Sequence, residues 1–361
     1  MKNKHHMMIA GATGLIGATA IEHFTGLPDW SLTALSRRKP AARAGLRHIS
    51  VDLTDYPACE RALSEVDDVT HLLYAALYEK PDLVAGWRDE AQMAVNLAML
   101  QNLINVLDIR APALRHITIL QGSKAYGSHI EPAPVPCKER APRHPHQSFY
   151  WLQEDFLRSM QPKRGWNFSI LRPQMVMGYA LNSPMNVVAA VGAYAVIQRE
   201  LGRPLCFPGG GPYVYGASDS RVIARAVEFV GTHEIAANET YNVNNGDVWM
   251  WREVWPRIAR HFGMALGEPT PQRLSETMPA HEALWTRIGE KYALAPVPLS
   301  QLVGSSWQFT DGSFAYGIER PAHSLLSSIK LRQHGFTDCL DTEDALIYWL
   351  TRMQDEKVLP R

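Results

Sequence analysis

The chain has 361 residues, of which 46% are hydrophobic and 20% are charged, which provides for one large core or a core with a smaller lobe. Lys plus Arg and Asp plus Glu both number 36, so no overall charge attracts nucleic acid or an acidic membrane surface. The four cysteines are scattered without metal-ligand spacing, and no run approaches the roughly 20 apolar residues of a membrane span.

Short apolar runs alternate with longer amphipathic ones through the first half of the chain. The pattern predicts strands at 7–10, 32–36, 47–51, 69–75, 116–121 and 167–171. It predicts helices at 16–24, at 85–107 and from 148 onward. His5 and His6 precede the first strand without further ligands, so we expect both to be solvated. Strands alternating with helices pair in parallel, which predicts a Rossmann-type doubly wound α/β sheet with ligands at the carboxyl ends of its strands.

The alternation stops after residue 173. We expect an apolar helix at 185–201, a turn-rich segment at 204–212, a helix at 219–230 and a Trp-, Pro- and Met-rich region from 249. The chain therefore divides into a dinucleotide-binding core and a smaller, mainly C-terminal substrate lobe. The core is assigned to 1–173, with 212–247 partly returning to it. The lobe is assigned to 174–211 and 248–335, and 336–361 is expected to pack on the core as a helix.

A glycine-rich loop follows the first predicted strand and opens the first helix. Glycines let a backbone turn sharply and approach a pyrophosphate, and the helix N-terminus then offers free N–H groups. This context predicts dinucleotide binding. The residues expected to contact the cofactor here are Gly11, Thr13, Gly14, Leu15, Ile16 and Gly17.

Basic residues stand at the end of the second strand, where an NAD-binding protein usually carries an acid. The sequence there is Ser36-Arg37-Arg38, and guanidinium groups can hold a 2′-phosphate in a fork. A solvated basic turn would show the same residues, but their place at the end of the second strand favours NADP(H). Asp52 and Leu53, after the third strand, are candidates for the adenine edge, although a turn role fits Asp52 as well.

Two segments carry candidate catalytic side chains. Gln121-Gly-Ser-Lys124-Ala-Tyr126 ends the fifth strand, and Ser148-Phe-Tyr150-Trp151 opens the next helix. With the glycine loop, they resemble the extended short-chain dehydrogenase/reductase family. The Tyr-x-x-x-Lys motif of that family is broken here, because the position four residues after Tyr150 is Glu154. Gly122 stands where the family usually has Ser or Thr.

One branch of that family shares these departures. The sequence resembles the progesterone 5β-reductase and iridoid synthase group, whose Gly-x-Lys-x-Tyr motif matches residues 122–126, and the likeness extends over nearly the whole chain. It departs from the group at Ala125 and Trp151, which puts the substrate in question. The resemblance implies reduction of the activated C=C bond of an enone or enal. Tyr150 would donate to the developing enolate oxygen, and Lys124 would lower the pKa of the phenol or else hold the ribose or the strand end.

The remaining candidate cofactor contacts lie at other strand ends. Small residues after the fourth strand would let the cofactor pass, and the segment after the sixth strand resembles the one that meets the nicotinamide amide. These candidates, with the fifth strand end, are Ala75, Ala76, Gln121, Gly122, Pro173, Met175 and Val176. Tyr126 is expected to be structural. Several large apolar residues could either line a hydrophobic pocket or pack in the core: Tyr194, Met185 and the cluster of Trp249, Trp251 and Trp255.

Three other functions remain open at this stage. A nucleotide-sugar epimerase or dehydratase would share the fold, a carbonyl reductase could use the same tyrosine, and an NADP-binding sensor would need no turnover. We expect a cytoplasmic protein that takes a small hydrophobic carbonyl substrate and binds no metal, nucleic acid or membrane. The oligomeric state, including a homodimer, stays open.

Overall fold

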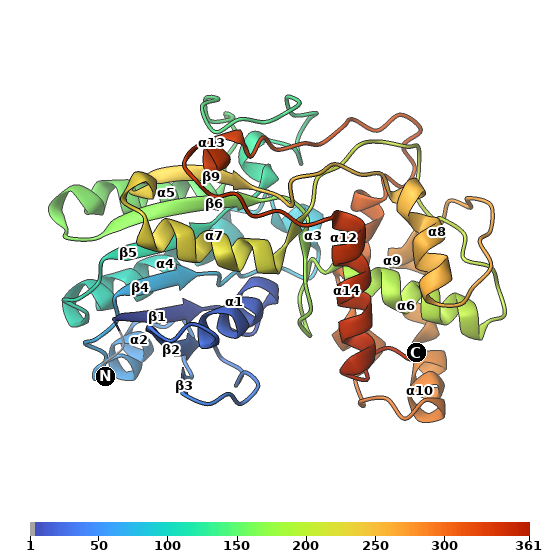
Figure 1. The fold of residues 1–361 in the computed structure, drawn as a ribbon, viewed down its shortest axis with the longest axis horizontal. Coiled ribbons are helices and arrows are strands. Elements are labelled where there is room, and N and C mark those ends of the chain that lie inside the picture. The colour runs from blue at the N-terminus through green and yellow to red at the C-terminus, as the bar shows by residue number, and fades with distance from the viewer. Residues whose placement is uncertain (1–3) are drawn as a thin grey trace.

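In the computed structural model, which describes residues 4–361, a seven-stranded sheet carries helices on both faces and a group of helices lies beside it (Figure 1). Met1 to Asn3, where the predicted core begins, lie outside the described residues. The strand order is β3-β2-β1-β4-β5-β6-β9, and all neighbours are parallel. The strands are β1 (His5–Ala10), β2 (Trp30–Leu35), β3 (Leu46–Ile49), β4 (His71–Tyr74), β5 (His116–Leu120), β6 (Asn167–Pro173) and β9 (Glu239–Val243).

Different helices cover the two faces of the sheet. One face packs against α1 (Leu15–Thr25), α7 (Ser220–Thr232) and α13 (Ile329–Gln333). The other packs against α2 (Tyr56–Ala62), α4 (Glu90–Arg110) and α5 (Phe149–Met160). The Rossmann-type doubly wound fold is therefore confirmed. The strand order reverses between β1 and β4, so the binding crevice of this fold opens at their carboxyl ends.

The sequence predicted six of the seven strands and misjudged one helix. The seventh strand, β9, was not predicted, and it pairs with β6 at the edge of the sheet. The single helix expected at 85–107 is wrong, because the chain forms α3 (Leu83–Gly86) and then α4. The carboxylate of Asp89 accepts a hydrogen bond from the backbone N–H of Gln92 at 2.8 Å and starts α4 as its N-cap.

The lobe is built around α6 (Val187–Glu200), which is apolar on all sides and buried over most of its length. Its neighbours are α8 (Trp251–His261), α9 (Leu274–Thr277), α10 (Glu282–Lys291), α11 (Leu299–Leu302), α12 (Ser306–Ser313) and α14 (Thr342–Asp355). The remaining short elements are β7 (Val176–Met177), β8 (Ser218–Asp219), η1 (Ser123–Tyr126), η2 (Gln161–Lys163), η3 (Glu234–Ala236) and η4 (Pro279–His281). In the described part of the chain, no helix has the length and apolar character that crossing a membrane requires.

The C-terminal segment contacts both the core and the lobe. We expected 336–361 to pack on the core; Phe336 and Leu340 do join the core cluster, whereas the apolar side chains of α14 join the hydrophobic cluster of the lobe. Leu346, Leu350 and Met353 are fully buried there. The helix is amphipathic, and its apolar stripe is covered by α6 and α8 of the lobe. Its link to the core is polar, since the indole N–H of Trp349 donates to Asp219 at 2.8 Å.

Histidines are buried at the amino ends of the central strands. His6 is 8% exposed and its ring contacts Thr33 at 2.8 Å, so the expectation that it is solvated is wrong. His71 and His116 face each other in register on β4 and β5. Burial lowers the pKa of His71 to about 4 and that of His116 to about 3. Both rings are therefore neutral in the folded protein at pH 7.

These depressed pKa values predict a loss of stability in mild acid. In the unfolded chain these two histidines take up protons near pH 6.5, whereas in the folded chain they do not. Their full contribution to the free energy of unfolding is therefore present above pH 6.5, and it is lost as the pH falls toward 4. His71 alone accounts for about 3 kcal/mol of this loss. Urea unfolding of the wild type and of His71→Asn at pH 7 and 4.5 measures it. The variant should show a clearly smaller difference between the two pH values, and an equal difference would contradict the assignment.

Candidate active site

A cavity of about 580 Å³ opens at the carboxyl ends of the central strands. Its walls come from the segments that follow β1 to β6, from Tyr215, and from the lobe, which contributes residues 182–185, 308, 309, 312 and 313. Nineteen of the twenty predicted site residues contribute to its lining. They are Gly11, Thr13, Gly14, Leu15, Ile16, Ser36, Arg37, Arg38, Asp52, Leu53, Ala75, Ala76, Gln121, Gly122, Lys124, Tyr150, Pro173, Met175 and Val176.

The glycine loop needs its glycines for close approach. Gly11 has φ +82°, and a Cβ at this position would lie 2.5 Å from the carbonyl oxygen of Ala75. Gly17 is the predicted site residue that does not line the cavity. A Cβ on Gly17 would lie 2.2 Å from the carbonyl oxygen of Gly11, so its role is to let α1 pack against the loop. The predicted contact of Gly17 with the cofactor stays a prediction.

The N-terminus of α1 is left open toward the cavity. Gly14 is its N-cap and provides no side chain, and the first turn carries no acidic residue. The orphan N–H groups of that turn and the positive end of the helix dipole therefore remain available to an anion. The loop and helix fit the pyrophosphate of a dinucleotide, which supports the expectation from the sequence.

Two arginines and one aspartate occupy the β2 and β3 ends of the cavity. The guanidinium groups of Arg37 and Arg38 belong to exposed residues that line it. Asp52 is turned into its own loop, where its carboxylate accepts from the N–H of Thr54 at 2.9 Å and from the Thr54 hydroxyl at 2.8 Å. These hydrogen bonds, with a smaller effect of Arg37, lower the pKa of Asp52. The carboxylate of Asp52 is thus held in a turn, which agrees with the turn role that the sequence offered as the alternative to an adenine contact.

Tyr150 is fixed at the start of α5 by contacts on both sides. Its backbone N–H donates to Ser148 Oγ at 3.2 Å, and its carbonyl accepts from Gln121 Nε2 at 3.2 Å. A Cβ built on Gly122 would lie 3.4 Å from the Tyr150 hydroxyl oxygen and 3.4 Å from the carbonyl oxygen of Pro173. The phenol hydroxyl therefore lies at the ends of β5 and β6, inside the cavity.

Burial determines the protonation state of this phenol. It raises the pKa of Tyr150 above its usual value, Glu79 raises it further and Arg172 opposes both. We expected Lys124 to lower the pKa of Tyr150, but the net shift is upward, because the desolvation of a phenolate and the charge of Glu79 outweigh the positive charge of Arg172. Tyr150 is therefore a neutral hydrogen-bond donor.

Lys124 enters the cavity from η1, directly after β5. Its ammonium group lies over the ring of Trp87, 4.0 Å from the centroid, and 3.8 Å from Glu79 Oε1. Burial lowers the pKa of Lys124 to about 8, and the charge of Glu79 acts against this shift. The amine is thus mostly protonated at pH 7 and loses its charge in mild alkali.

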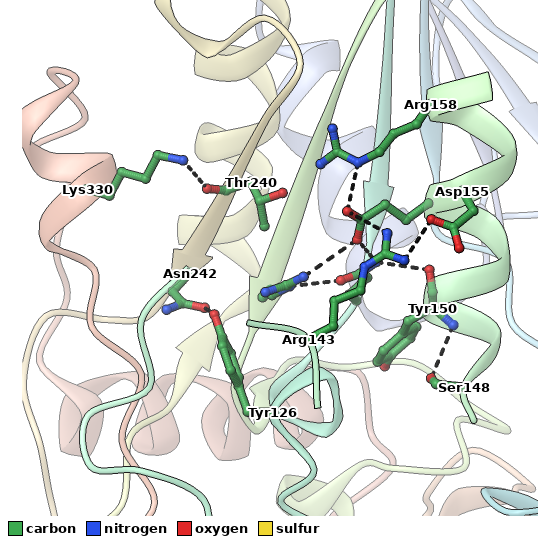
Figure 2. Close-up of polar contacts among 12 residues, drawn as sticks. Tyr126, Arg143, Ser148, Tyr150, Asp155, Arg158, Thr240, Asn242 and Lys330 are labelled. Carbon is green, nitrogen blue, oxygen red and sulfur yellow. Dashed lines mark hydrogen bonds and ion pairs between the residues drawn. The ribbon is translucent and has the colours of Figure 1, made fainter. Parts of the chain in front are cut away.

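Glu154 stands four residues after Tyr150, where the Tyr-x-x-x-Lys motif has its lysine, and its buried carboxylate has a structural role. Glu154 Oε1 accepts from Arg158 Nε at 2.9 Å and lies 3.0 Å from Arg143, and the two arginines approach it from different sides (Figure 2). Glu154 Oε2 accepts from Gln121 Nε2 at 3.3 Å, and Gln121 Oε1 accepts from Arg172 Nε at 2.8 Å. The network ties α5 to the ends of β5 and β6, so it positions the helix that carries Tyr150.

Several aromatic candidates lie outside the cavity. Tyr126 donates from its hydroxyl to Asn242 Oδ1 at 2.7 Å and does not line the cavity (Figure 2). Tyr194 and the Trp249, Trp251 and Trp255 cluster belong to the hydrophobic core of the lobe. Met185 is the exception, since it lines the cavity. Among the described residues no group of three or more His, Cys, Asp or Glu side chains could hold a metal ion.

The sequence did not reveal the apolar walls of the cavity or the partner of Lys124. The missed lining residues include Tyr78, Val84, Trp87, Phe149 and Phe309. Glu79 was missed as well, because it lies in the loop beyond the end of β4 and belongs to no motif in the sequence. The others come from segments that only the tertiary fold brings to one place.

The fold and this cavity define an enzyme of the extended short-chain dehydrogenase/reductase type. The family model described as PRISE-like Rossmann-fold domain matches residues 54–319, and the chain belongs to this family. The chain is 29% identical to the short chain dehydrogenase gsfE of Penicillium aethiopicum, covering 98% of both proteins. It is also 29% identical to an (S)-8-oxocitronellyl enol synthase of Camptotheca acuminata, covering 98% of this chain and 93% of that protein.

The likeness to solved structures is one of fold. A crystal structure of UDP-glucose 4-epimerase superimposes with a TM-score of 0.70 at 14% identity, covering 98% of both chains. At this identity the match speaks for the architecture alone. The resemblance to the iridoid synthase group that the sequence suggested is confirmed by the family model and by the enol synthase relatives.

Proposed function

We propose that the protein is an NADPH-dependent reductase that transfers hydride to the β-carbon of an activated C=C bond in a small, uncharged enone or enal. One observation carries the proposal: Tyr150 and Lys124 line the same cavity as the glycine loop. The relatives named (S)-8-oxocitronellyl enol synthase support an enol as the product of such a step.

The residues at the cofactor end fit NADPH. The open α1 terminus and Gly11 suit the pyrophosphate, and Arg37 and Arg38 suit a 2′-phosphate that an acid would repel. Bound NADPH supplies the hydride from its nicotinamide. The strand-end residues Pro173, Met175 and Val176 line the cavity beside Tyr150 and are proposed to hold that ring.

Tyr150 acts through its neutral hydroxyl. Negative charge develops on the substrate oxygen as the β-carbon accepts hydride, and a preformed donor strengthens its hydrogen bond as that charge grows. The Lys124 ammonium adds positive charge to the same end of the cavity. The α-carbon then takes its proton from water, so the chain needs no second acid.

The charges of the cavity favour an uncharged substrate. Among the described lining residues the charged ones are Arg37, Arg38, Asp52 and Lys124, and the ammonium of the last faces Glu79. The walls beyond Tyr150 are apolar and aromatic, including Val84, Trp87, Phe149 and Phe309. A diphosphate of a nucleotide sugar would find no free arginine at this end, which speaks against an epimerase.

Product analysis after NADPH oxidation tests the proposal. We expect loss of NADPH absorbance with enals and enones and a saturated aldehyde or ketone as product. An allylic alcohol as the product would instead indicate carbonyl reduction, which the same tyrosine can support. Tight NADPH binding with no turnover on any enal, enone or aldehyde would contradict a reductase and favour a sensor.

A further inference from the structure

A buried carboxylate stands behind the amine of the proposed active site. The side chain of Glu79 is 3% exposed, and its Oε1 lies 3.8 Å from Lys124 Nζ, too far for a direct hydrogen bond. This oxygen is buried and has no hydrogen-bond partner in the described structure. A desolvated carboxylate oxygen without a hydrogen-bond donor is costly, so its main compensation is the nearby ammonium.

The segment that carries Glu79 is held in place by α4. Gln92 Nε2 donates to Glu79 Oε2 at 2.7 Å, and Gln92 Oε1 accepts from the backbone N–H of Lys80 at 2.9 Å. Asn96 holds the preceding residue, because its amide accepts from the N–H of Tyr78 and donates to its carbonyl, both at 2.9 Å. Two amide side chains thus fix the backbone on both sides of Glu79, which makes the carboxylate position a built feature.

Lys124 depends on that carboxylate for its charge. No hydrogen-bond acceptor contacts its ammonium in the described residues, and its other neighbour is the face of Trp87. A ring face stabilises an ammonium less than hydration does, so burial alone would favour the neutral amine. Glu79 is the group that opposes this effect.

We propose that Glu79 is a positioning residue, the counter-ion that keeps Lys124 protonated and holds its N–H bonds toward the carbonyl oxygen of the substrate. The proposal rests on the reductase function proposed above. Glu79 touches neither substrate nor cofactor in it and acts through the amine alone. The ion pair also keeps this end of the cavity close to neutral, which suits uncharged substrates.

Other titratable groups line the same cavity as the amine. Tyr150 on α5 is neutral, as described above. His129 follows η1 and lines the cavity, and burial lowers its pKa to about 4, with the charges of His146, Lys124 and Arg88 also acting in that direction. His129 is therefore neutral at pH 7, and Glu79 is the one acid that faces Lys124 among the described contacts.

Glu79→Gln is the decisive variant because it keeps the shape and removes the charge. We expect the basic limb of the kcat/KM profile, near pH 8 in the wild type, to move down by about one to three pH units, as for loss of an opposite charge at this distance. Turnover at pH 6 should be affected much less than turnover at pH 8. Glu79→Asp keeps the charge and should keep the limb within about half a unit. Glu131→Gln removes an exposed carboxylate that pairs with His144 and should leave the profile unchanged.

A direct titration separates this inference from the reductase proposal. Reductive methylation with ¹³C-formaldehyde labels the lysines, and the NMR signal that is absent from Lys124→Arg belongs to Lys124. A midpoint near pH 8 in the wild type that falls by about one unit or more in Glu79→Gln supports the counter-ion role, whether or not any enone is turned over. An unchanged midpoint in Glu79→Gln overturns it, as does a fall of the same size in Glu131→Gln. If Glu79→Gln fails to fold, the Lys124 midpoint in two other proteins decides. A midpoint below pH 7 in the wild type, or below pH 7 in Glu79→Asp, would overturn the counter-ion role.

Discussion

Replacing Tyr150 with Phe is expected to lower kcat for an enone by about 100- to 1000-fold, the usual effect of losing one oxyanion donor. The variant retains the ring that packs at the start of α5 and loses the hydroxyl that lies at the ends of β5 and β6. The phenol oxygen makes no hydrogen bond that the fold needs in the described structure, so stability should change little. The Kd for NADPH, measured by fluorescence titration, should stay nearly constant while steady-state kcat collapses.

Tyr126→Phe provides the matched control. Its hydroxyl donates to Asn242 outside the cavity, so its removal should reduce the free energy of unfolding by about 1 kcal/mol and leave kcat close to wild type. Equal turnover in Tyr150→Phe and wild type would remove this tyrosine from the mechanism. A loss of turnover in Tyr126→Phe of the same size would show that the effect of either change is structural.

The core of the fold could be predicted because its signals are local. β1, β4 and β5 are short, mainly apolar runs between turns, as expected of strands that are buried on both faces. β9 carries polar residues over part of its length and is recognisable as a strand only through its pairing with β6. The amphipathic stripe of α14 predicted a packed helix, but no local signal tells which of two apolar surfaces the stripe covers.

The residues of the candidate site also fall into those that a local motif reveals and those that only the tertiary fold brings together. The glycine loop, Lys124 and Tyr150 are short motifs in a recognisable context, and the structure brings them to one cavity. Trp87 and Glu79 act on Lys124 from segments about 40 residues away in the chain, so spacing could not identify them. The upward pKa shift of Tyr150 was unpredictable for a related reason, since burial is a property of the assembled fold.

Cofactor preference should depend on the two arginines after β2. We expect Arg37→Ala with Arg38→Ala to raise the Kd for NADPH by about 10- to 100-fold, because charge-assisted contacts to a phosphate contribute about 1.5–3 kcal/mol. The Kd for NADH should change by less than about threefold, since NADH lacks the 2′-phosphate. Fluorescence titration of both cofactors with both proteins measures the selectivity directly.

The comparison of the two cofactors is what makes this test specific to the 2′-phosphate. Arg37 and Arg38 lie at an exposed end of the cavity, so their loss should not disturb the core. Arg43→Ala, which removes an arginine paired with Glu22, controls for the general loss of positive charge and should leave both Kd values unchanged. Raising the salt concentration should weaken NADPH binding in the wild type more than in the double variant, because exposed charges are screened. If the double variant weakens NADH and NADPH equally, the arginines hold the cofactor without selecting its phosphate, and the assignment to NADPH loses its basis.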